Sequence, residues 1–316
     1  SAVHYTTYTE YDALRRPKLV IGPDPDGSGP LKRRAERTTY DPVGRVISRQ
    51  TGTVTGTTGV DFVAVSTTTY TYDAVGNETQ VYTDAGTDTA GLSQTSHDNV
   101  NRPTCQVVRM NPATFAAVYG AGSRPNACAL GATGSDGPDR IERTIYDAAG
   151  QVLELRQAVG TPLERTYSTT TYSPNGQPQS LTDANGNRST MTYDGFDRLQ
   201  RLNFPVAQKG AGVSSTTDYE QYGYDASGNR TSLRRRSGGI LTFAYDPLGR
   251  MSDKSGTGID AVSYAYDRAG RPLNAVFEAT GQGVVYGYDT AGRQTSEATF
   301  GQALAYDYDK ASNLIR

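Results

Sequence analysis

The chain has 316 residues, of which 35% are apolar, and its mean hydropathy is −0.59. Its 31 basic and 33 acidic residues leave a net charge of −2, so the sequence has no charge excess for nucleic acid or an anionic membrane surface. It has no run near the ~20 apolar residues of a membrane span, and its 22 tyrosines exclude a disordered chain.

A short motif recurs along the chain: Tyr-Asp, two variable residues, then Gly and a polar residue. A repeat of this kind predicts a single array over residues 1–316, because one unit cannot bury its own faces alone. Seven copies keep all three fixed residues: Tyr40, Asp41 and Gly44; Tyr72, Asp73 and Gly76; Tyr146, Asp147 and Gly150; Tyr224, Asp225 and Gly228; Tyr245, Asp246 and Gly249; Tyr266, Asp267 and Gly270; Tyr288, Asp289 and Gly292. Six more are degenerate: Tyr11-Asp12, His97-Asp98, Tyr172-Ser173, Thr182-Asp183, Tyr193-Asp194 and Tyr308-Asp309.

Residues 261–283 show what each copy is expected to form. An alternating segment ends at Tyr266, the turn residues Asp267 to Gly270 follow, and an extended segment begins at Arg271. Asp suits the first position of a type I turn, where its carboxylate accepts a backbone N–H, and Gly suits the left-handed position after it. The sequence therefore predicts strand, tight turn with a bulge, strand and looser turn in each unit.

A second aromatic residue stands two positions before the repeat Tyr in six copies. Because side chains alternate along a strand, both rings are expected on one face. We expect the rings to line up from hairpin to hairpin as a structural ladder, and a stacking platform for sugars or bases is the alternative. The six residues are Tyr70, Tyr222, Phe243, Tyr264, Tyr286 and Tyr306.

The longest gap between copies lies between Asp98 and Asp147 and predicts an insertion over residues 103–140. Pro112 and Gly120 frame a segment that reads as one or two helical turns. Cys105 and Cys128 also lie in this insertion. In an oxidising compartment a disulfide between them would close the loop, and two free thiols are the alternative.

No catalytic, cofactor-binding or metal site is expected. The histidines His4 and His97 are too few for a triad or a histidine metal cluster, and His97 stands in a repeat Tyr position. Residues 24–29 resemble the first half of a calcium loop, but its twelfth position is Ala35 instead of Glu, which favours a plain turn. A hydrolase or autoprotease is therefore disfavoured.

The consensus Tyr-Asp-x-x-Gly-Arg/Asn resembles the YD repeat, also called the RHS repeat. This repeat occurs in bacterial Rhs toxins, in toxin-complex B and C components and in teneurins. The resemblance runs from Tyr11-Asp12 to Tyr308-Asp309. It implies an all-β fold of tandem antiparallel β-hairpins in a curved or spiralling sheet, here an open arc or partial shell. The chain starts and stops within the pattern, so we expect a fragment of something longer.

Two functions fit these features. The first is a non-catalytic structural segment of a β shell or scaffold in a secreted or surface-exposed bacterial protein, where it encloses a toxin if it acts as its relatives do. The alternative is an adhesion module that binds carbohydrate or protein. Expected partners are other segments of the same longer polypeptide or a toxin cargo, with glycans or cell-surface proteins under the alternative. Nucleic acid and membrane insertion are not expected, and the expected location is extracellular, either secreted or at the cell surface.

Overall fold

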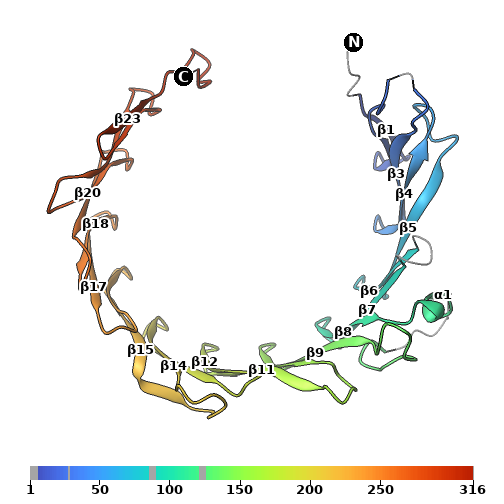
Figure 1. The fold of residues 1–316 in the computed structure, drawn as a ribbon, viewed down its shortest axis with the longest axis horizontal. Helices are drawn as coiled ribbons and strands as arrows, with labels where there is room; N and C mark the ends of the chain where they lie inside the picture. Colours follow the sequence, from blue (N-terminus) through green and yellow to red (C-terminus); the bar gives the residue numbers. More distant parts are fainter. Residues whose placement is uncertain (1–5, 28, 85–89, 121–125, 316) are drawn as a thin grey trace. The chain divides into compact units, whose positions relative to one another are not determined.

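The computed structural model describes residues 6–27, 29–84, 90–120 and 126–315, which form 23 strands and one helix (Figure 1). The chain divides into two compact units, residues 1–169 and 170–316. The first unit contains β1 (Tyr8–Tyr11), β2 (Pro17–Ile21), β3 (Arg33–Tyr40), β4 (Val46–Val54), β5 (Val63–Tyr72), β6 (Glu78–Asp84), β7 (Gly91–His97), β8 (Pro103–Arg109), α1 (Pro112–Gly120), β9 (Arg140–Tyr146) and β10 (Val152–Gln157).

The boundary between the units falls inside β11 (Arg165–Tyr172). The second unit contains β12 (Pro178–Asp183), β13 (Arg188–Tyr193), β14 (Leu199–Pro205), β15 (Ser214–Tyr224), β16 (Arg230–Arg234), β17 (Ile240–Tyr245), β18 (Met251–Gly256), β19 (Val262–Tyr266), β20 (Pro272–Phe277), β21 (Gly283–Tyr288), β22 (Gln294–Thr299) and β23 (Gln302–Ala305). No helix among the described residues has the length and apolar character needed to cross a membrane.

All 23 strands belong to one antiparallel sheet in which consecutive strands pair. In the described part of the chain, β1 pairs only with β2 and β23 only with β22, so the sheet is not closed. Within each unit, successive strands follow a curved path (Figure 1). The predicted fold class, tandem antiparallel β-hairpins, is confirmed. The single array over residues 1–316 stays a prediction.

The repeat turn has the geometry that its residue types require. In the hairpin β19–β20, the Gly270 N–H donates to the Asp267 carbonyl at 3.1 Å, and the Asp267 N–H donates to the Arg271 carbonyl at 3.0 Å. Gly270 has φ +85°, the left-handed region that glycine enters without strain. The strand register shifts by one residue just before Tyr266, which is the predicted bulge.

Twelve of the thirteen copies form turns at one end of the strands. Eleven of these turns join an odd-numbered strand to the next even-numbered one, and the turn at Asp309 follows β23. The copy at Asp183 has the same hydrogen bonds but joins β12 to β13. It therefore lies at the opposite end of the strands. Its Tyr position is occupied by Thr182, whereas every copy at the other end of the strands has Tyr there except the copy with His97.

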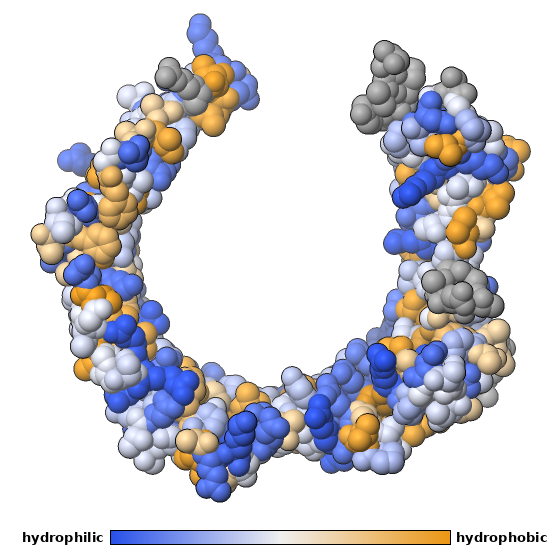
Figure 2. All heavy atoms as spheres, in the orientation of Figure 1, coloured by the Kyte–Doolittle hydropathy of each residue, from blue (hydrophilic) through white to orange (hydrophobic). Residues whose placement is uncertain are grey.

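Little of the molecule is a hydrophobic core. The first unit has two small buried clusters, one around Leu19, Ile21 and Val54 and one around Val107 and Ile141. In the described part of the second unit, Phe243 is the buried apolar side chain. Figure 2 accordingly shows hydrophilic and hydrophobic residues interspersed over the visible surface. A single-layer sheet of this kind depends on its strand ladders, turns and cross-strand contacts.

The turn geometry predicts unequal effects of two substitutions at Gly270. Gly270→Val should destabilise the chain by about 1–2 kcal/mol, because a β-branched residue resists a positive φ. Gly270→Asn should cost less, since Asn101 occupies the equivalent position with φ +67°. Urea unfolding followed by circular dichroism measures both, and equal midpoints for the two variants would contradict the turn assignment.

Candidate functional site

The described repeat turns gather charged groups at regular intervals along the chain. Asp246 shows the arrangement: its Oδ1 accepts the N–H groups of Leu248 and Arg250 at 2.9 and 3.0 Å. Its Oδ2 accepts the Arg250 Nε–H at 2.6 Å. The hydrogen bond from the Arg250 side chain, with those from the backbone, holds the pKa of the Asp246 carboxyl below its ordinary value of 3.8. The carboxylate is thus fully occupied in organising its own turn.

The arginine of this turn also reaches the next hairpin. The Arg250 guanidinium lies 4.6 Å from the centre of the Tyr266 ring, and its Nη1 donates to the Asp267 carbonyl at 3.1 Å. A guanidinium over an aromatic face within ~6 Å is a cation–π contact. Seven such contacts, at 4.4 to 4.8 Å, join one turn to the Tyr of the next: Arg16 to Tyr40, Arg45 to Tyr72, Arg102 to Tyr146, Arg198 to Tyr224, Arg250 to Tyr266, Arg271 to Tyr288 and Arg293 to Tyr308.

The tyrosine hydroxyl makes the return contact. It donates to the carbonyl of the residue that directly follows the preceding motif at this edge, as Tyr288 does to Pro272 at 2.9 Å. Eight hydroxyls do this at 2.8 to 3.0 Å: Tyr40 to Pro17, Tyr72 to Val46, Tyr146 to Pro103, Tyr193 to Pro178, Tyr224 to Leu199, Tyr245 to Arg230, Tyr288 to Pro272 and Tyr308 to Gln294. Each half-buried ring beneath an arginine is therefore fixed at its face, and most of these rings also at the hydroxyl.

The predicted ladder consists of aromatic rings alone, whereas the structure places guanidinium groups over the repeat rings. The role of the arginine was not predicted. Among the described residues, a ring-to-ring stack at 5.1 Å joins Tyr82 and Tyr119, which are not repeat positions. The sequence does not single out this role, because the copies that end in Gln151, Gln177 and Asn229 are followed at this edge by a copy with Tyr just as those that end in Arg are. Where His97 replaces Tyr, the preceding copy ends in Asn77.

The other candidates considered for chemistry do not come together. His97 is half-buried in the repeat Tyr register opposite Pro103, and His4 lies outside the described residues. In the calcium-like segment, Asp24 pairs with Arg33 at 2.9 Å and Asp26 accepts the Leu31 N–H, while Ser28 is not among the described residues. The described part of the chain has no group of three or more His, Cys, Asp or Glu placed to hold a metal.

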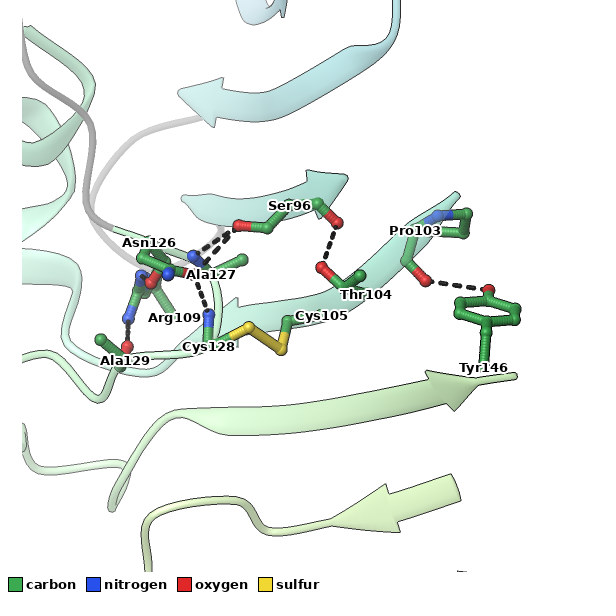
Figure 3. The surroundings of a disulfide bond; sticks show 10 residues. All are labelled: Ser96, Pro103, Thr104, Cys105, Arg109, Asn126, Ala127, Cys128, Ala129 and Tyr146. Atoms are coloured by element: carbon green, nitrogen blue, oxygen red, sulfur yellow. Dashed lines mark hydrogen bonds between the residues drawn. A yellow bond between two sulfur atoms is a disulfide. The ribbon is translucent and has the colours of Figure 1, made fainter. Parts of the chain in front are cut away.

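The insertion is attached to the sheet at its disulfide (Figure 3). Cys105 in β8 is bonded to Cys128, and both pack with Val107 and Ile141. The Ala127 N–H donates to the Ser96 hydroxyl at 3.0 Å. Strand β8 ends at Arg109 and β9 begins at Arg140, so the interval between them is shorter than the predicted 103–140. The difference arises because Pro103–Arg109 form β8 and pair on both sides with β7 and β9.

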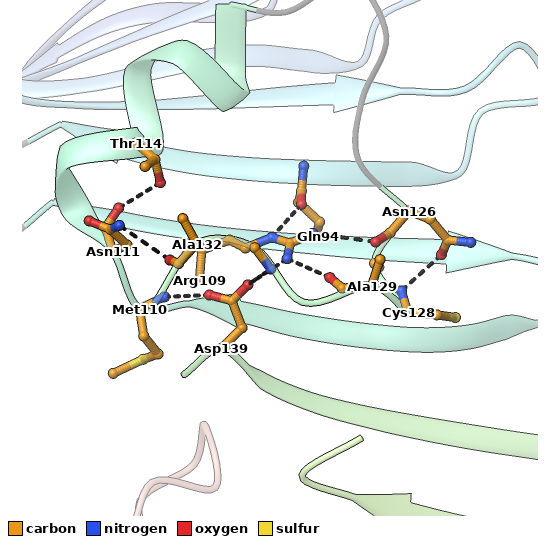
Figure 4. Close-up of polar contacts among 12 residues, drawn as sticks. Gln94, Arg109, Met110, Asn111, Thr114, Asn126, Cys128, Ala129, Ala132 and Asp139 are labelled. Atoms are coloured by element: carbon orange, nitrogen blue, oxygen red, sulfur yellow. Dashed lines mark hydrogen bonds and ion pairs between the residues drawn. The ribbon is translucent and has the colours of Figure 1, made fainter. Parts of the chain in front are cut away.

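A buried ion pair holds the other end of the insertion (Figure 4). Arg109 donates to Asp139 at 2.6 Å and to Gln94 at 2.8 Å, and Asp139 accepts the Met110 N–H. Burial raises the pKa of the Asp139 carboxyl, but the hydrogen bonds from Arg109 and the backbone outweigh it and leave that pKa lowered. The ion pair therefore stays charged and fixes the insertion on the sheet.

Comparisons with known proteins agree with the motif. Residues 172–205 match the family model described as RHS Repeat, which confirms the predicted resemblance. Among solved structures, the chain is similar to the crystal structures of TcdB2-TccC3-TEV and TcdB2-TccC3 and to the Photorhabdus luminescens Tc holotoxin pore. The identities are 16%, 15% and 14%, and the TM-scores are 0.46, 0.46 and 0.41.

Each of these three similarities covers 98% of this chain but 19%, 20% and 19% of the solved chains. The chain thus spans about a fifth of their length. The search of curated proteins gives no match.

The arginine contacts predict that Arg271→Ala lowers stability, with ~0.5–1 kcal/mol from the lost Tyr288 stacking alone. Arg271→Asn should cost less, because asparagine in this position bonds the turn carboxylate, as Asn229 does with Asp225 at 2.9 Å. The matched control is Arg165→Ala, which removes an exposed arginine with no described side-chain partner. Urea unfolding of the three variants provides the comparison. An Arg271→Ala midpoint equal to that of the control would exclude a stabilising role.

The turn carboxylates of Asp246 and Asp289 predict a loss of stability in acid. The pKa of the Asp246 carboxyl is lowered in the folded chain mainly by the hydrogen bond from the Arg250 side chain, and the pKa of the Asp289 carboxyl mainly by the hydrogen bond from the Arg293 backbone N–H. The unfolded chain therefore binds more protons as the pH falls below the ordinary value of 3.8, and stability present above that pH is lost.

Urea midpoints measured from about pH 6 down to about pH 2.5 should fall most steeply below that value. Asp246→Asn should show a smaller fall, because one of the groups that gains a proton has been removed. If the variant and the parent had parallel pH profiles, Asp246 would not be one of the groups responsible.

Proposed function

We propose that this RHS-repeat chain is a non-catalytic structural segment, part of a β shell or scaffold in a secreted or surface-exposed bacterial protein. One observation carries the proposal: the polar groups of the repeat are occupied by contacts within and between hairpins. At Asp267, both carboxylate oxygens accept hydrogen bonds from Ala269 and Arg271 of its own turn. Carboxylates used in this way hold the turns together and are not free to act as acids, bases or nucleophiles.

The proposed location outside the cell has separate support. Cys105 and Cys128 form a disulfide, and structural disulfides persist in oxidising compartments. The proposed partners are other segments of a longer polypeptide, because the outer edges of β1 and β23 carry no described strand partner. The family resemblance extends the proposal to a toxin polypeptide enclosed by the shell.

The alternative, a carbohydrate- or protein-binding module, requires a contiguous row of accessible rings. The repeat tyrosines with an arginine over them are half-buried and have their faces covered. This arrangement supports the scaffold over the binding module. A glycan array with the purified chain is the direct test of the alternative, and a reproducible glycan signal would favour it.

The scaffold is tested in the full-length natural protein by the protease half-life of the polypeptide that adjoins this segment. Gly249→Val and Gly270→Val together disturb two neighbouring turns. The half-life of the adjoining polypeptide should then fall by roughly tenfold, because a loss of ~1.4 kcal/mol in the stability of the scaffold makes its open, protease-accessible form ten times more populated. Arg165→Ala is the control and should leave it unchanged. If the double variant lost β-structure while the adjoining polypeptide kept its half-life, the shell role would be refuted.

A further inference from the structure

Strand β15 in the second unit contains a wide bulge. Its pairing with β14 runs through Asn203 and Tyr219 and then through Pro205 and Ser214, so residues 215–218 lie opposite a single residue of β14. Extra residues of this kind bend a strand away from its partner, and such bulges are common beside binding sites. Here the bulge borders an open recess of about 550 Å³.

The recess is lined by uncharged polar residues and one arginine, Arg201. The side chains of Thr192 and Gln221 line it and have no hydrogen-bond partner among the described residues, and no described carboxylate lines it. Thr192 directly precedes the repeat residue Tyr193, and side chains alternate along a strand, so the recess lies on the face away from that ring. It is therefore separate from the arginine–tyrosine contacts of the repeat turns.

Arg201 is held in place by neutral groups. Its Nε donates to the Asn203 Oδ1 at 2.9 Å, and its Nη2 donates to the Thr216 carbonyl at 2.8 Å. Its guanidinium lies 3.6 Å from the centre of the Tyr219 ring. The arginines that stack in the repeat turns each pair with the carboxylate of their own turn. Arg201 has no ion pair among the described residues, and its Nη1 has no described hydrogen bond.

A second arginine lies on the other face of the same ring. The Arg234 guanidinium in β16 is 3.8 Å from the centre of the Tyr219 ring, and β14 and β16 flank β15 on opposite sides. Arg234 donates to the Tyr219 carbonyl at 2.7 Å and, like Arg201, has no ion pair among the described residues. Two positive charges are thus held close together without a paired carboxylate.

The two acidic residues of β15 do not neutralise these charges, because both are engaged elsewhere. Asp218 accepts hydrogen bonds from Arg236 with both carboxylate oxygens, and Glu220 accepts the Tyr222 hydroxyl at 2.7 Å. A chain with a net charge of −2 therefore has a local excess of positive charge beside a polar recess. Guanidinium groups in such a setting bind oxyanions, since their N–H groups match the oxygens in charge and spacing.

We propose that this recess is a binding site for a tetrahedral oxyanion, a sulfate or phosphate group, with Arg201 as its principal contact. The Arg201 Nη1 donates to the oxyanion, the Thr192 hydroxyl and the Gln221 amide add neutral hydrogen bonds, and Arg234 adds positive charge from across the ring. The recess is larger than one oxyanion requires, so a small polar molecule that carries the group as a monoester also fits. The site does not depend on the proposed scaffold function.

The ¹⁵N–¹H NMR signals of the arginine Nε–H groups test the proposal, with inorganic phosphate and inorganic sulfate as probes in a sodium chloride background. The Arg201 signal should shift along a saturable curve. Its midpoint should lie about tenfold below the concentrations that shift Arg268, since charge-assisted hydrogen bonds in a formed site give a difference of that size. Arg268 is the matched reference, an exposed arginine of the same unit with no described side-chain partner. Identical curves for the two arginines would overturn the proposal.

Titration calorimetry with phosphate extends the test to variants. Arg201→Lys keeps the charge but loses the planar fork, so it should bind about tenfold more weakly, and an unchanged affinity would overturn the role of Arg201. Arg234→Gln should weaken binding roughly threefold through the loss of one screened charge. Arg268→Gln makes the same change in net charge and should have no effect. Equal affinities of the Arg234→Gln and Arg268→Gln variants would overturn the part assigned to Arg234.

Phosphoserine distinguishes a free oxyanion from a monoester. Tighter binding of phosphoserine than of inorganic phosphate would assign the site to an oxyanion carried on a larger molecule. Equal or weaker binding would overturn that extension and leave the free ion as the ligand. None of these titrations bears on the scaffold, which is judged by the protease half-life of the adjoining polypeptide.

Discussion

The arginine after the repeat glycine makes contacts with two hairpins at once. Arg271 bonds the carboxylate of Asp267 in its own turn and lies over the ring of Tyr288 in the next. Tyr288 in turn donates to the carbonyl beside that arginine. The contact between these two hairpins therefore combines a charge-assisted hydrogen bond, a cation–π contact and a hydroxyl bond to the backbone. The position of one hairpin is thereby set by the turn of the one before it.

This coupling explains how so polar a chain forms ordered β-structure. A globular domain buries apolar faces against a second layer, but here most strands have no second layer. Stability comes from many similar local terms, each between neighbouring hairpins, as in other repeat proteins. The first unit supplements them with two small apolar clusters, a disulfide and the buried pair of Arg109 and Asp139. The disulfide and the ion pair lie at the insertion between β8 and β9, where the repeat supplies no contacts between hairpins. They fix the insertion on the sheet in place of those contacts.

The features that are local in sequence could be predicted from it. The turn at Asp267 to Gly270 follows from backbone chemistry, and so does the short helix that begins at Pro112. The role of Arg271 was not predicted, because its partner Tyr288 is in another hairpin and strand order decides which ring it meets. The sequence also does not distinguish the turn at Asp183 from the others. Turn residues are the same at both ends of the strands, and only the order of the strands along the chain shows at which end a turn lies.

A double-mutant cycle on Arg271 and Tyr288 tests the central claim most directly. The free energies of unfolding of Arg271→Ala, Tyr288→Leu and the double variant, measured in urea, give the coupling between the two side chains. The account predicts a favourable coupling of about 0.5–1 kcal/mol, because either single change already removes the stacking. A control cycle of Arg271 with the distant Tyr245 should be additive within ~0.3–0.5 kcal/mol. Additivity for Arg271 and Tyr288 themselves would contradict the claim that arginine joins neighbouring hairpins.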